Sequence, residues 1–195
     1  MRWYPPQAYE ALTADVSEIL ITAEEIEQRV QEIGEEISRD YAGRNPLLIG
    51  VLKGVVPFIA DLLRVITVPV EVDFMAVSSY SAEAREEGVV RLVKDLEVPI
   101  TGRHVLFVED IIDTGLTLSY LLRTLRARQP ASLEVCVLFN KPKHRLVDVS
   151  LAYKGFDLPD RLVVGWGLDY RERYRNLPFV GLLKPEVFQE DVRDA

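Results

Sequence analysis

Residues 105–117 read Val-Leu-Phe-Val-Glu-Asp-Ile-Ile-Asp-Thr-Gly-Leu-Thr, and this stretch decides the fold. Its first four residues form a short continuous apolar run, which is typical of a strand that is buried on both faces of a parallel sheet. A helix is expected at 117–128, because Leu118, Leu121, Leu122 and Leu125 recur at helical spacing. A buried strand, a short polar turn and an amphipathic helix together predict one strand–helix unit of an α/β protein.

The same alternation recurs on both sides of this unit. Apolar runs predict further strands at 47–52, 70–77, 133–139 and 162–168, and the pattern at 55–65 predicts a helix whose first turn tolerates Pro57. Thr22 and Glu25 form a capping box that opens another helix, with one apolar face from Ile26 to Tyr41. This alternation predicts an α/β fold built on a central, mostly parallel sheet.

Two segments do not fit the alternation. Residues 78–88 are small, polar and charged, and they separate expected strands at 70–77 and 89–95. Connections of this length are uncommon in compact domains unless they are lids or disordered, so we expect a hairpin with a mobile tip. Residues 1–14, which include Pro5 and Pro6, are expected to form a loose or docking arm.

The bulk composition excludes several classes of protein. The chain has 195 residues, of which 48% are hydrophobic and 28% charged, as in one globular domain. A single cysteine, Cys136, excludes an internal disulfide and a cysteine-rich zinc site. The sequence contains neither a membrane-length apolar run nor the apolar core of a signal peptide, so we expect a cytoplasmic protein with no membrane partner. The net charge of −8 argues against a nucleic-acid partner, because such proteins usually carry a basic patch.

Polar residues collect where the 105–108 strand is expected to end, which is where open α/β sheets bind their ligands. Gly115 lets the backbone approach a ligand closely, and Thr114 and Thr117 add hydroxyl donors to the N–H groups of the turn and the helix start. These groups predict a nest for one phosphate. Glu109 and Asp110 come just before it, and carboxylates accept hydrogen bonds from ribose hydroxyls and help to hold Mg²⁺. The stretch therefore predicts a ribose-5-phosphate site.

Residues 108–117 resemble the signature of the type I phosphoribosyltransferases, in the form found in the hypoxanthine-guanine enzymes. The resemblance extends from about residue 19 to residue 183. It implies a central, mostly parallel sheet flanked by helices, a small base-binding hood within 140–195 and a flexible hairpin lid at 78–88. It also implies purine salvage, in which 5-phosphoribosyl-1-pyrophosphate and Mg²⁺ serve to attach hypoxanthine or guanine through N9, and an assembly that is a homodimer or homotetramer.

Members of this family bind the parts of their substrates through separate groups of residues. The resemblance implies that the sugar phosphate is held by Glu109, Asp110, Asp113, Thr114, Gly115, Leu116 and Thr117, the pyrophosphate by Lys53, Gly54 and Arg175, the purine by Lys141, Leu162, Val163 and Asp169, and Mg²⁺ by Glu109, Asp110 and Asp169, while Ser79 and Tyr80 belong to the lid.

Three of these residues bear on the reaction and on the choice of base. Asp113 is the implied general base near purine N7, and it must wait in its ionised form. Lys141 is the implied donor to a 6-oxo group; adenine would present a donor instead, a mismatch of about 1–3 kcal/mol. Leu162 stands where the family usually has an aromatic residue, so about 0.5–1.5 kcal/mol of ring contact is missing unless Trp166 or Tyr170 compensates.

Some alternatives remain open at this point. One is a phosphoribosyltransferase for another base, such as xanthine, and another is an RNA-binding regulator that reuses the fold. The regulator predicts a basic face, whereas the chain has 31 acidic and 23 basic residues. The motifs of dinucleotide-binding enzymes, P-loop enzymes and serine hydrolases are absent from the sequence. His104 and His144 have no carboxylate or cysteine cluster beside them in the sequence, and we expect both to be structural.

Overall fold

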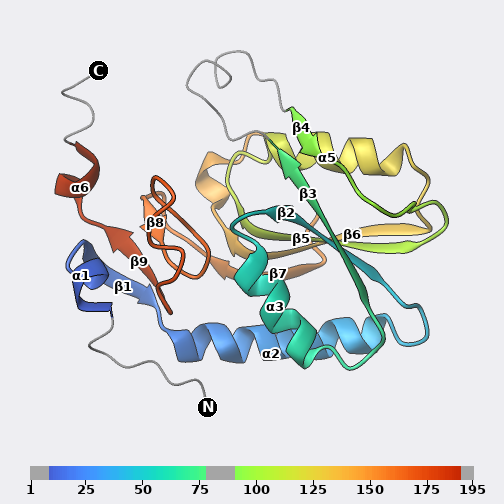
Figure 1. Ribbon diagram of the computed structural model, residues 1–195, viewed down its shortest axis with the longest axis horizontal. Coiled ribbons are helices and arrows are strands. Elements are labelled where there is room, and N and C mark those ends of the chain that lie inside the picture. The colour runs from blue at the N-terminus through green and yellow to red at the C-terminus, as the bar shows by residue number, and fades with distance from the viewer. Residues whose placement is uncertain (1–8, 78–90, 190–195) are drawn as a thin grey trace.

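A six-stranded sheet lies at the centre of the computed structural model, which describes residues 9–77 and 91–189 (Figure 1). The strand order is β4-β3-β2-β5-β6-β7; the pairs from β3 to β7 are parallel, and β4 is antiparallel to β3. This arrangement confirms the predicted α/β fold with a mostly parallel sheet. The strands are β2 (Leu47–Leu52), β3 (Glu71–Val77), β4 (Leu92–Lys94), β5 (His104–Ile112), β6 (Ser132–Asn140) and β7 (Tyr153–Asp157).

Helices cover both faces of this sheet. α2 (Ala23–Asp40) and α3 (Val56–Val65) lie on one face, and α5 (Leu116–Arg126) lies on the other (Figure 1). The capping box is present: Thr22 accepts the Glu25 N–H at 3.3 Å and donates its own N–H to the Glu25 carboxylate at 2.8 Å. Neighbouring strand residues face opposite layers, since Leu106 packs with α2 and α3 while Phe107 packs with α5. No helix in the described ranges is long and apolar enough to cross a membrane.

A second, smaller sheet joins the two ends of the described chain. It has the order β1-β9-β8 and is antiparallel throughout, with β1 (Val16–Ile21), β9 (Val180–Leu183) and β8 (Val163–Val164). α1 (Glu10–Thr13) and α6 (Pro185–Gln189) lie beside it, at the left of Figure 1. Tyr9 and Leu12 pack against its apolar cluster, so residues 9–14 are docked on the small sheet and are not a loose arm; docking was the other form expected for this segment. Residues 1–8 lie outside the described ranges.

The strand expected at 162–168 is also wrong, because only Val163–Val164 is extended. Gly165, Trp166 and Gly167 follow with φ values of +107°, +47° and +97°, and the left-handed region cannot continue a pleated strand. The Leu168 N–H instead donates back to the Gly165 carbonyl at 3.0 Å, closing a tight turn. This turn replaces the predicted parallel strand with a loop on the hood.

Other boundaries move by a few residues, and one shift affects the site. β5 continues past the expected end at 108 to Ile112, so Glu109 and Asp110 lie within the strand and not in a loop after it. α5 begins at Leu116, one residue before the predicted start, and ends at Arg126. The hairpin of β3 and β4 is confirmed by antiparallel pairing of Val77 with Leu92. Its expected tip at 78–88, with Ser79 and Tyr80, lies outside the described residues.

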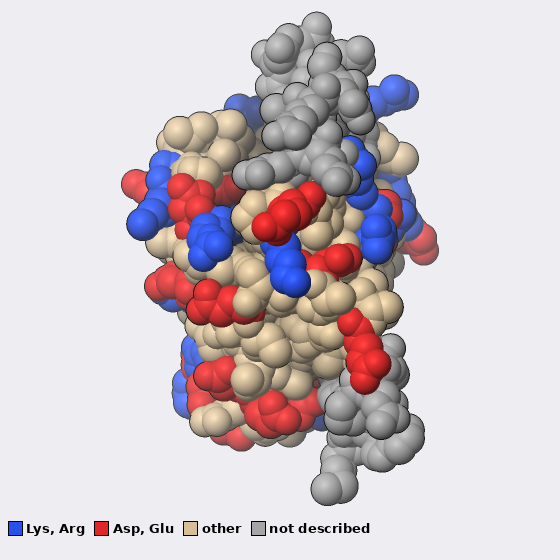
Figure 2. Space-filling view, turned by 90° about the vertical axis from the view of Figure 1, so that its left-hand side faces the viewer, with Lys and Arg blue, Asp and Glu red and all other residues tan. Residues whose placement is uncertain are grey.

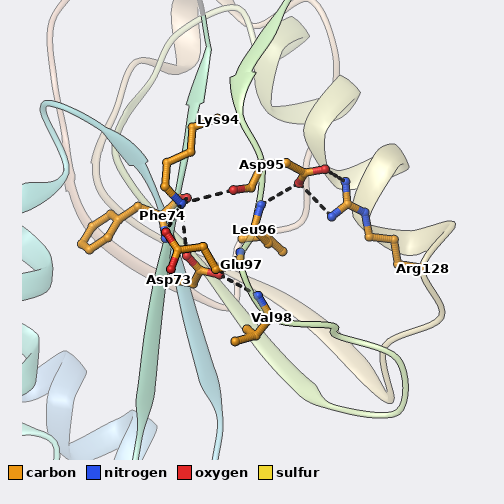
Figure 3. A network of polar contacts seen from close by, with 8 residues as sticks. All are labelled: Asp73, Phe74, Lys94, Asp95, Leu96, Glu97, Val98 and Arg128. Carbon is orange, nitrogen blue, oxygen red and sulfur yellow. Dashed lines mark hydrogen bonds and ion pairs between the residues drawn. The ribbon is translucent and has the colours of Figure 1, made fainter.

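A buried carboxylate fastens the base of that hairpin (Figure 3). Asp73 on β3 is 7% exposed and accepts the N–H groups of Phe74 at 2.7 Å, Glu97 at 2.7 Å and Val98 at 3.3 Å. The ammonium of Lys94 lies 3.5 Å from the same carboxylate. Burial alone would raise the pKa of Asp73, but the three N–H donors and Lys94 outweigh it and lower the pKa.

Candidate active site

The peptide bond between Leu52 and Lys53 is cis, and the next residue, Gly54, lies against residues from distant parts of the chain. A Cβ on Gly54 would collide with the Asp110 carboxylate and would lie 3.4 Å from a terminal nitrogen of Arg175. A side chain at this position therefore has no room, which explains the requirement for glycine. The contact places the predicted pyrophosphate loop beside the predicted sugar acids.

Arg175 is the centre of an ion-pair cluster next to this loop. Its guanidinium lies 2.8 Å from the Asp169 carboxylate and donates to the Gly167 carbonyl at 2.8 Å. Glu172 lies 3.4 Å from Arg175 and accepts from the Lys53 ammonium at 3.0 Å. The two predicted pyrophosphate cations thus share one carboxylate, which the sequence analysis did not single out. Its position midway between the predicted residues 169 and 175 was the available signal.

Glu109 and Asp110 lie at the end of β5 in an environment that disfavours their charges. Burial raises the pKa of Asp110 to about 6, although the Ile111 N–H at 2.7 Å and the positive charge of Arg175 lower it. Burial also raises the pKa of Glu109, and the neighbouring Asp110 charge adds to this. Oε2 of Glu109 is buried with no hydrogen-bond partner among the described residues. An unsatisfied buried oxygen of this kind needs a donor or a cation, which a ligand could bring.

The residues predicted to form a phosphate nest lie in the turn before α5 and in its first turn. Gly115 precedes the helix with φ +82°, and the Leu116 N–H lies 3.4 Å from the Thr114 hydroxyl. The segment 145–147 supports this turn: Leu146 and Val147 donate their N–H groups to the Thr114 carbonyl at 2.9 and 3.2 Å. A Cβ on Gly115 would lie 2.6 Å from the Val147 carbonyl oxygen. The nest is therefore held in place by the 145–147 segment.

Asp113 is fixed through its backbone while its carboxylate remains accessible. The Arg145 guanidinium donates to the Asp113 carbonyl at 2.9 Å and also reaches the side-chain carbonyl of Asn140. Asn140 in turn donates to the Asp157 carboxylate at 2.6 Å, at the end of β7. The Asp113 side chain is 47% exposed, as a group that must meet a substrate requires. Thr117 follows this loop in the sequence and lies in the first turn of α5.

The predicted purine residues lie on the other side of Asp113. The Lys141 N–H donates to the Ile112 carbonyl at 2.9 Å, which holds the ends of β5 and β6 together. The Lys141 ammonium donates to the Arg161 carbonyl at 2.8 Å, immediately before half-buried Leu162. Val163 is 5% exposed and pairs with Leu182 of β9. Lys141 and Leu162 are thus brought together by the hood.

Of the two aromatic residues considered as replacements for the missing stacking ring, Trp166 is excluded by its position. It is 4% exposed and packs in the core between the central sheet and the helices α2 and α3. Tyr170 is half-buried and packs against the cluster of the small sheet. Leu162 packs against that same cluster, so a purine placed there would meet an aliphatic surface.

The two histidines differ from one another. His104 begins β5, at the end opposite to the acids, and its Nδ1 lies 2.8 Å from the Ser132 hydroxyl, which fits the expected structural role. His144 has no carboxylate cluster beside it in the sequence, but two carboxylates lie near it in space. Its Nδ1 lies 3.5 Å from Asp113 Oδ1 and its Nε2 lies 2.9 Å from Asp160 Oδ2.

Comparison with known proteins agrees with this geometry. Residues 16–173 match the family described as phosphoribosyl transferase domain. A hypoxanthine-guanine phosphoribosyltransferase of Mycobacterium avium is 50% identical over 192 residues, or 95% of each chain. One of Streptococcus agalactiae serotype V is 49% identical over 92% of this chain and 99% of its own.

The solved structures agree as well. A crystal structure of a hypoxanthine phosphoribosyltransferase of Staphylococcus aureus superposes with a TM-score of 0.88 at 42% identity, covering 92% of this chain and 97% of the other. The type I fold implied by the resemblance is therefore confirmed. The chain belongs to the phosphoribosyltransferase family and, within it, to the hypoxanthine-guanine phosphoribosyltransferases.

Proposed function

We propose that this chain transfers the 5-phosphoribosyl group of 5-phosphoribosyl-1-pyrophosphate to N9 of hypoxanthine or guanine, giving IMP or GMP and pyrophosphate. The observation that carries this proposal is the place of Asp113. Its loop leads into the phosphate nest at 114–117, and the backbone of Lys141 is hydrogen-bonded to the residue directly before it, at 2.9 Å. A carboxylate between a sugar-phosphate site and a donor for a 6-oxo group suits this transfer.

The sugar and the pyrophosphate are assigned to separate surfaces. The nest formed by Thr114, Gly115, Leu116 and Thr117 takes the 5′-phosphate, because the backbone of a glycine turn at a helix N-terminus favours anions and two threonines add hydroxyl groups. The partnerless oxygen of Glu109 and the carboxylate of Asp110 take the ribose hydroxyls. The pyrophosphate lies over Lys53 and Gly54 and is gripped by the planar guanidinium of Arg175, which matches phosphate oxygens.

The transfer then requires one proton to move. The N9 lone pair attacks C1 of the ribose as the bond from C1 to the pyrophosphate oxygen breaks, and pyrophosphate leaves with that electron pair. The carboxylate of Asp113 takes the proton from N7 as the purine loses its positive charge. Closure of the lid that contains Ser79 and Tyr80 keeps water from capturing the sugar. These two residues lie outside the described ranges.

Mg²⁺ fits the residues of this site as a substrate-borne ion. The described residues contain no cluster of three or more metal-ligating side chains. Mg²⁺ commonly uses one or two carboxylates and completes its shell with water and substrate phosphates, so such a cluster is not needed. Glu109, Asp110 and Asp169 are the carboxylates that would hold it. When bound, the ion neutralises charge on the departing pyrophosphate.

A comparison of four bases tests the proposal. Nucleotide formation is measured by product chromatography with hypoxanthine, guanine, xanthine and adenine, in the presence of 5-phosphoribosyl-1-pyrophosphate and Mg²⁺. We expect the 6-oxopurines hypoxanthine and guanine to react and adenine to fail, because the Lys141 ammonium would face a donor. Equal use of adenine, or no product from any oxopurine, would overturn the proposal. Preference for xanthine would identify the alternative base.

Substitution of Asp113 tests its assigned role separately. Asp113→Asn keeps the size of the side chain but removes the proton acceptor, so turnover is expected to fall about 10²- to 10⁴-fold. Binding of 5-phosphoribosyl-1-pyrophosphate, measured by calorimetry, is expected to persist because the nest is intact. Unchanged turnover would remove Asp113 from the role of base.

A regulator that binds RNA with this fold is the alternative from another class of protein. On the face shown in Figure 2, acidic and basic side chains are interspersed among uncharged ones, which does not favour a polyanion. Filter binding with RNA at low and high salt distinguishes the two: tight, salt-sensitive binding would favour the regulator. The cytoplasmic location and the homodimeric or homotetrameric assembly stay predictions from the sequence.

A further inference from the structure

We propose that His144 is a positioning residue that holds the Asp113 carboxylate and connects it to the segment containing Asp160 and Arg161. The carbonyl of Arg161 accepts a hydrogen bond from the Lys141 ammonium. This inference rests on the proposed role of Asp113 as the base. His144 ends a short 3₁₀ turn, Pro142–His144, directly after β6. Its ring lies between two carboxylates, at 3.5 Å from Asp113 Oδ1 and 2.9 Å from Asp160 Oδ2.

The ring cannot drift far from Asp113, because the backbone beside it is fastened to the Asp113 loop. Arg145 donates its side-chain Nε–H to the Asp113 carbonyl at 2.9 Å, and Leu146 donates its N–H to the Thr114 carbonyl at 2.9 Å. His144 is the residue immediately before this double attachment. The distance between its ring and the carboxylate is therefore set by several backbone contacts and not by one side-chain torsion alone.

Asp160 supplies the second anchor and connects it to the purine side. It precedes Arg161, whose carbonyl accepts from the Lys141 ammonium at 2.8 Å. The same segment is attached to β6 through the Leu158 N–H, which donates to the Asn140 carbonyl at 2.7 Å. The His144 ring thus connects Asp113, the proposed acceptor of the N7 proton, to the segment containing Asp160 and Arg161. That segment orients Lys141, the proposed donor to the 6-oxo group.

The two ring nitrogens face different carboxylates, Nδ1 toward Asp113 and Nε2 toward Asp160. Both nitrogens of an imidazole can take part in hydrogen bonds, so one ring can hold two acceptors at a fixed separation. An alanine at this position can hold neither carboxylate.

The test compares His144→Ala and His144→Gln with Lys143→Ala, which removes a positive charge from the same loop. The side chains of Lys143 and His144 are both exposed, and the Tm of each of the three variants is measured to check folding. We expect both His144 variants to lose about two- to five-fold in kcat, the effect of one half-exposed ion pair, while the KM for 5-phosphoribosyl-1-pyrophosphate stays the same. We expect Lys143→Ala to behave like the wild type.

The split between kcat and KM supplies a readout that a merely structural role would not move. A misplaced Asp113 carboxylate lowers kcat while the KM for the sugar substrate stays the same, and Asp160→Asn, which removes one of the two anchors of the ring, is expected to give a smaller loss of kcat. An unchanged kcat in both His144 variants, or a loss of kcat that follows the Tm, would overturn the inference. Asp113→Asn is run beside them: if it retains turnover, the base assignment itself has failed, whereas a large loss there with wild-type behaviour of His144→Ala refutes the positioning role alone.

Discussion

Replacement of the buried Asp73 by asparagine should destabilise the protein more than any change at an exposed acid of the same network. Asp73 Oδ1 accepts the Phe74 N–H, and Oδ2 accepts the N–H groups of Glu97 and Val98 (Figure 3). In Asp73→Asn one of these oxygens becomes an NH₂ group. Whichever way the amide turns, at least one N–H then faces another donor, and the remaining bonds lose the help of a negative charge.

The magnitude follows from the number of bonds affected. One buried hydrogen bond to a charged group is worth about 1.5–3 kcal/mol, and weakening of the others adds to it, so we expect a loss of about 2–4 kcal/mol in the free energy of unfolding. For a domain of this size each kcal/mol lowers Tm by about 2–4 °C, so the Tm should fall by about 4–16 °C. Calorimetry and urea unfolding measure both quantities. Asp95→Asn is the matched control: Asp95 also pairs with Arg128 at 2.8 Å, but its side chain is 47% exposed, and we expect a loss of about 1 kcal/mol or less.

The pH dependence gives the same prediction a sign. The pKa of Asp73 is lowered in the folded protein. Its contribution is therefore fully present above the unfolded value of about 3.9 and is lost as pH falls through the lower folded value. The gap between the wild type and Asp73→Asn should be constant from pH 7 to about pH 5 and should shrink only below about pH 4. Equal stabilities at pH 7, or equal losses for Asp73→Asn and Asp95→Asn, would refute the reasoning.

Three further predictions concern the site. Glu109→Gln should raise the free energy of unfolding at pH 8 by about 1–2 kcal/mol and abolish activity, because the raised pKa of Glu109 means that its charged form is unfavourable in the folded protein. The difference in stability should vanish near pH 4, and a variant less stable than the wild type at pH 8 would contradict this prediction. Glu172→Gln removes the carboxylate that pairs with Lys53 and one of the two that pair with Arg175. It should lower the KM for 5-phosphoribosyl-1-pyrophosphate about two- to five-fold in steady-state assays, whereas a higher KM would show that Glu172 orients these cations. Leu162→Phe restores a ring face and should lower the KM for hypoxanthine by about two- to ten-fold, while an unchanged KM would mean that the purine does not rest on this residue.

The central sheet was predictable because its strands are locally explicit. Residues 47–52 and 105–108 are continuous apolar runs, and each is followed by a helix with a clear apolar face. Such segments are buried on both sides whatever the rest of the chain does. The resulting β2 and β5 pair in parallel, with Leu47 opposite Val105. The ligand-binding edge could therefore be located from the sequence, although the exact end of β5 could not.

The small sheet was not predictable in the same way. β1 pairs with β9, so Ile21 lies opposite Val180 across most of the length of the chain. The burial of β1 is confined to its end, so its sequence carries no strong alternation. One edge strand of the central sheet was missed for a related reason: β7 reads Tyr-Lys-Gly-Phe-Asp, which has little of the composition of a strand. These strands form because tertiary contacts favour them, and local patterns do not report such contacts.

The site divides along the same line. The residues of the proposed nest at 114–117 are neighbours in the sequence, so a motif can point to them. His144 lies 31 positions after Asp113 and 16 before Asp160, and only the meeting of β5, β6 and the hood brings the three together. Glu172 is 119 positions from Lys53, and only the folded structure shows that its carboxylate accepts a hydrogen bond from the Lys53 ammonium. The residues proposed to bind the substrate stand in motifs, whereas the residues that contact and orient those side chains are scattered along the sequence.

The cations on the pyrophosphate side are not free in the described part of the chain, and this affects how a substrate binds. Lys53 pairs with Glu172, and Arg175 pairs with Asp169 and Glu172. If Lys53 and Arg175 bind pyrophosphate as proposed, binding is an exchange of ion-pair partners, and such an exchange from partly exposed pairs costs little. The released carboxylates, however, add negative charge beside a polyanion in a chain that already carries −8. A divalent cation that arrives with the pyrophosphate offsets both charges at once, so the acid cluster favours the metal-bound substrate over the free one.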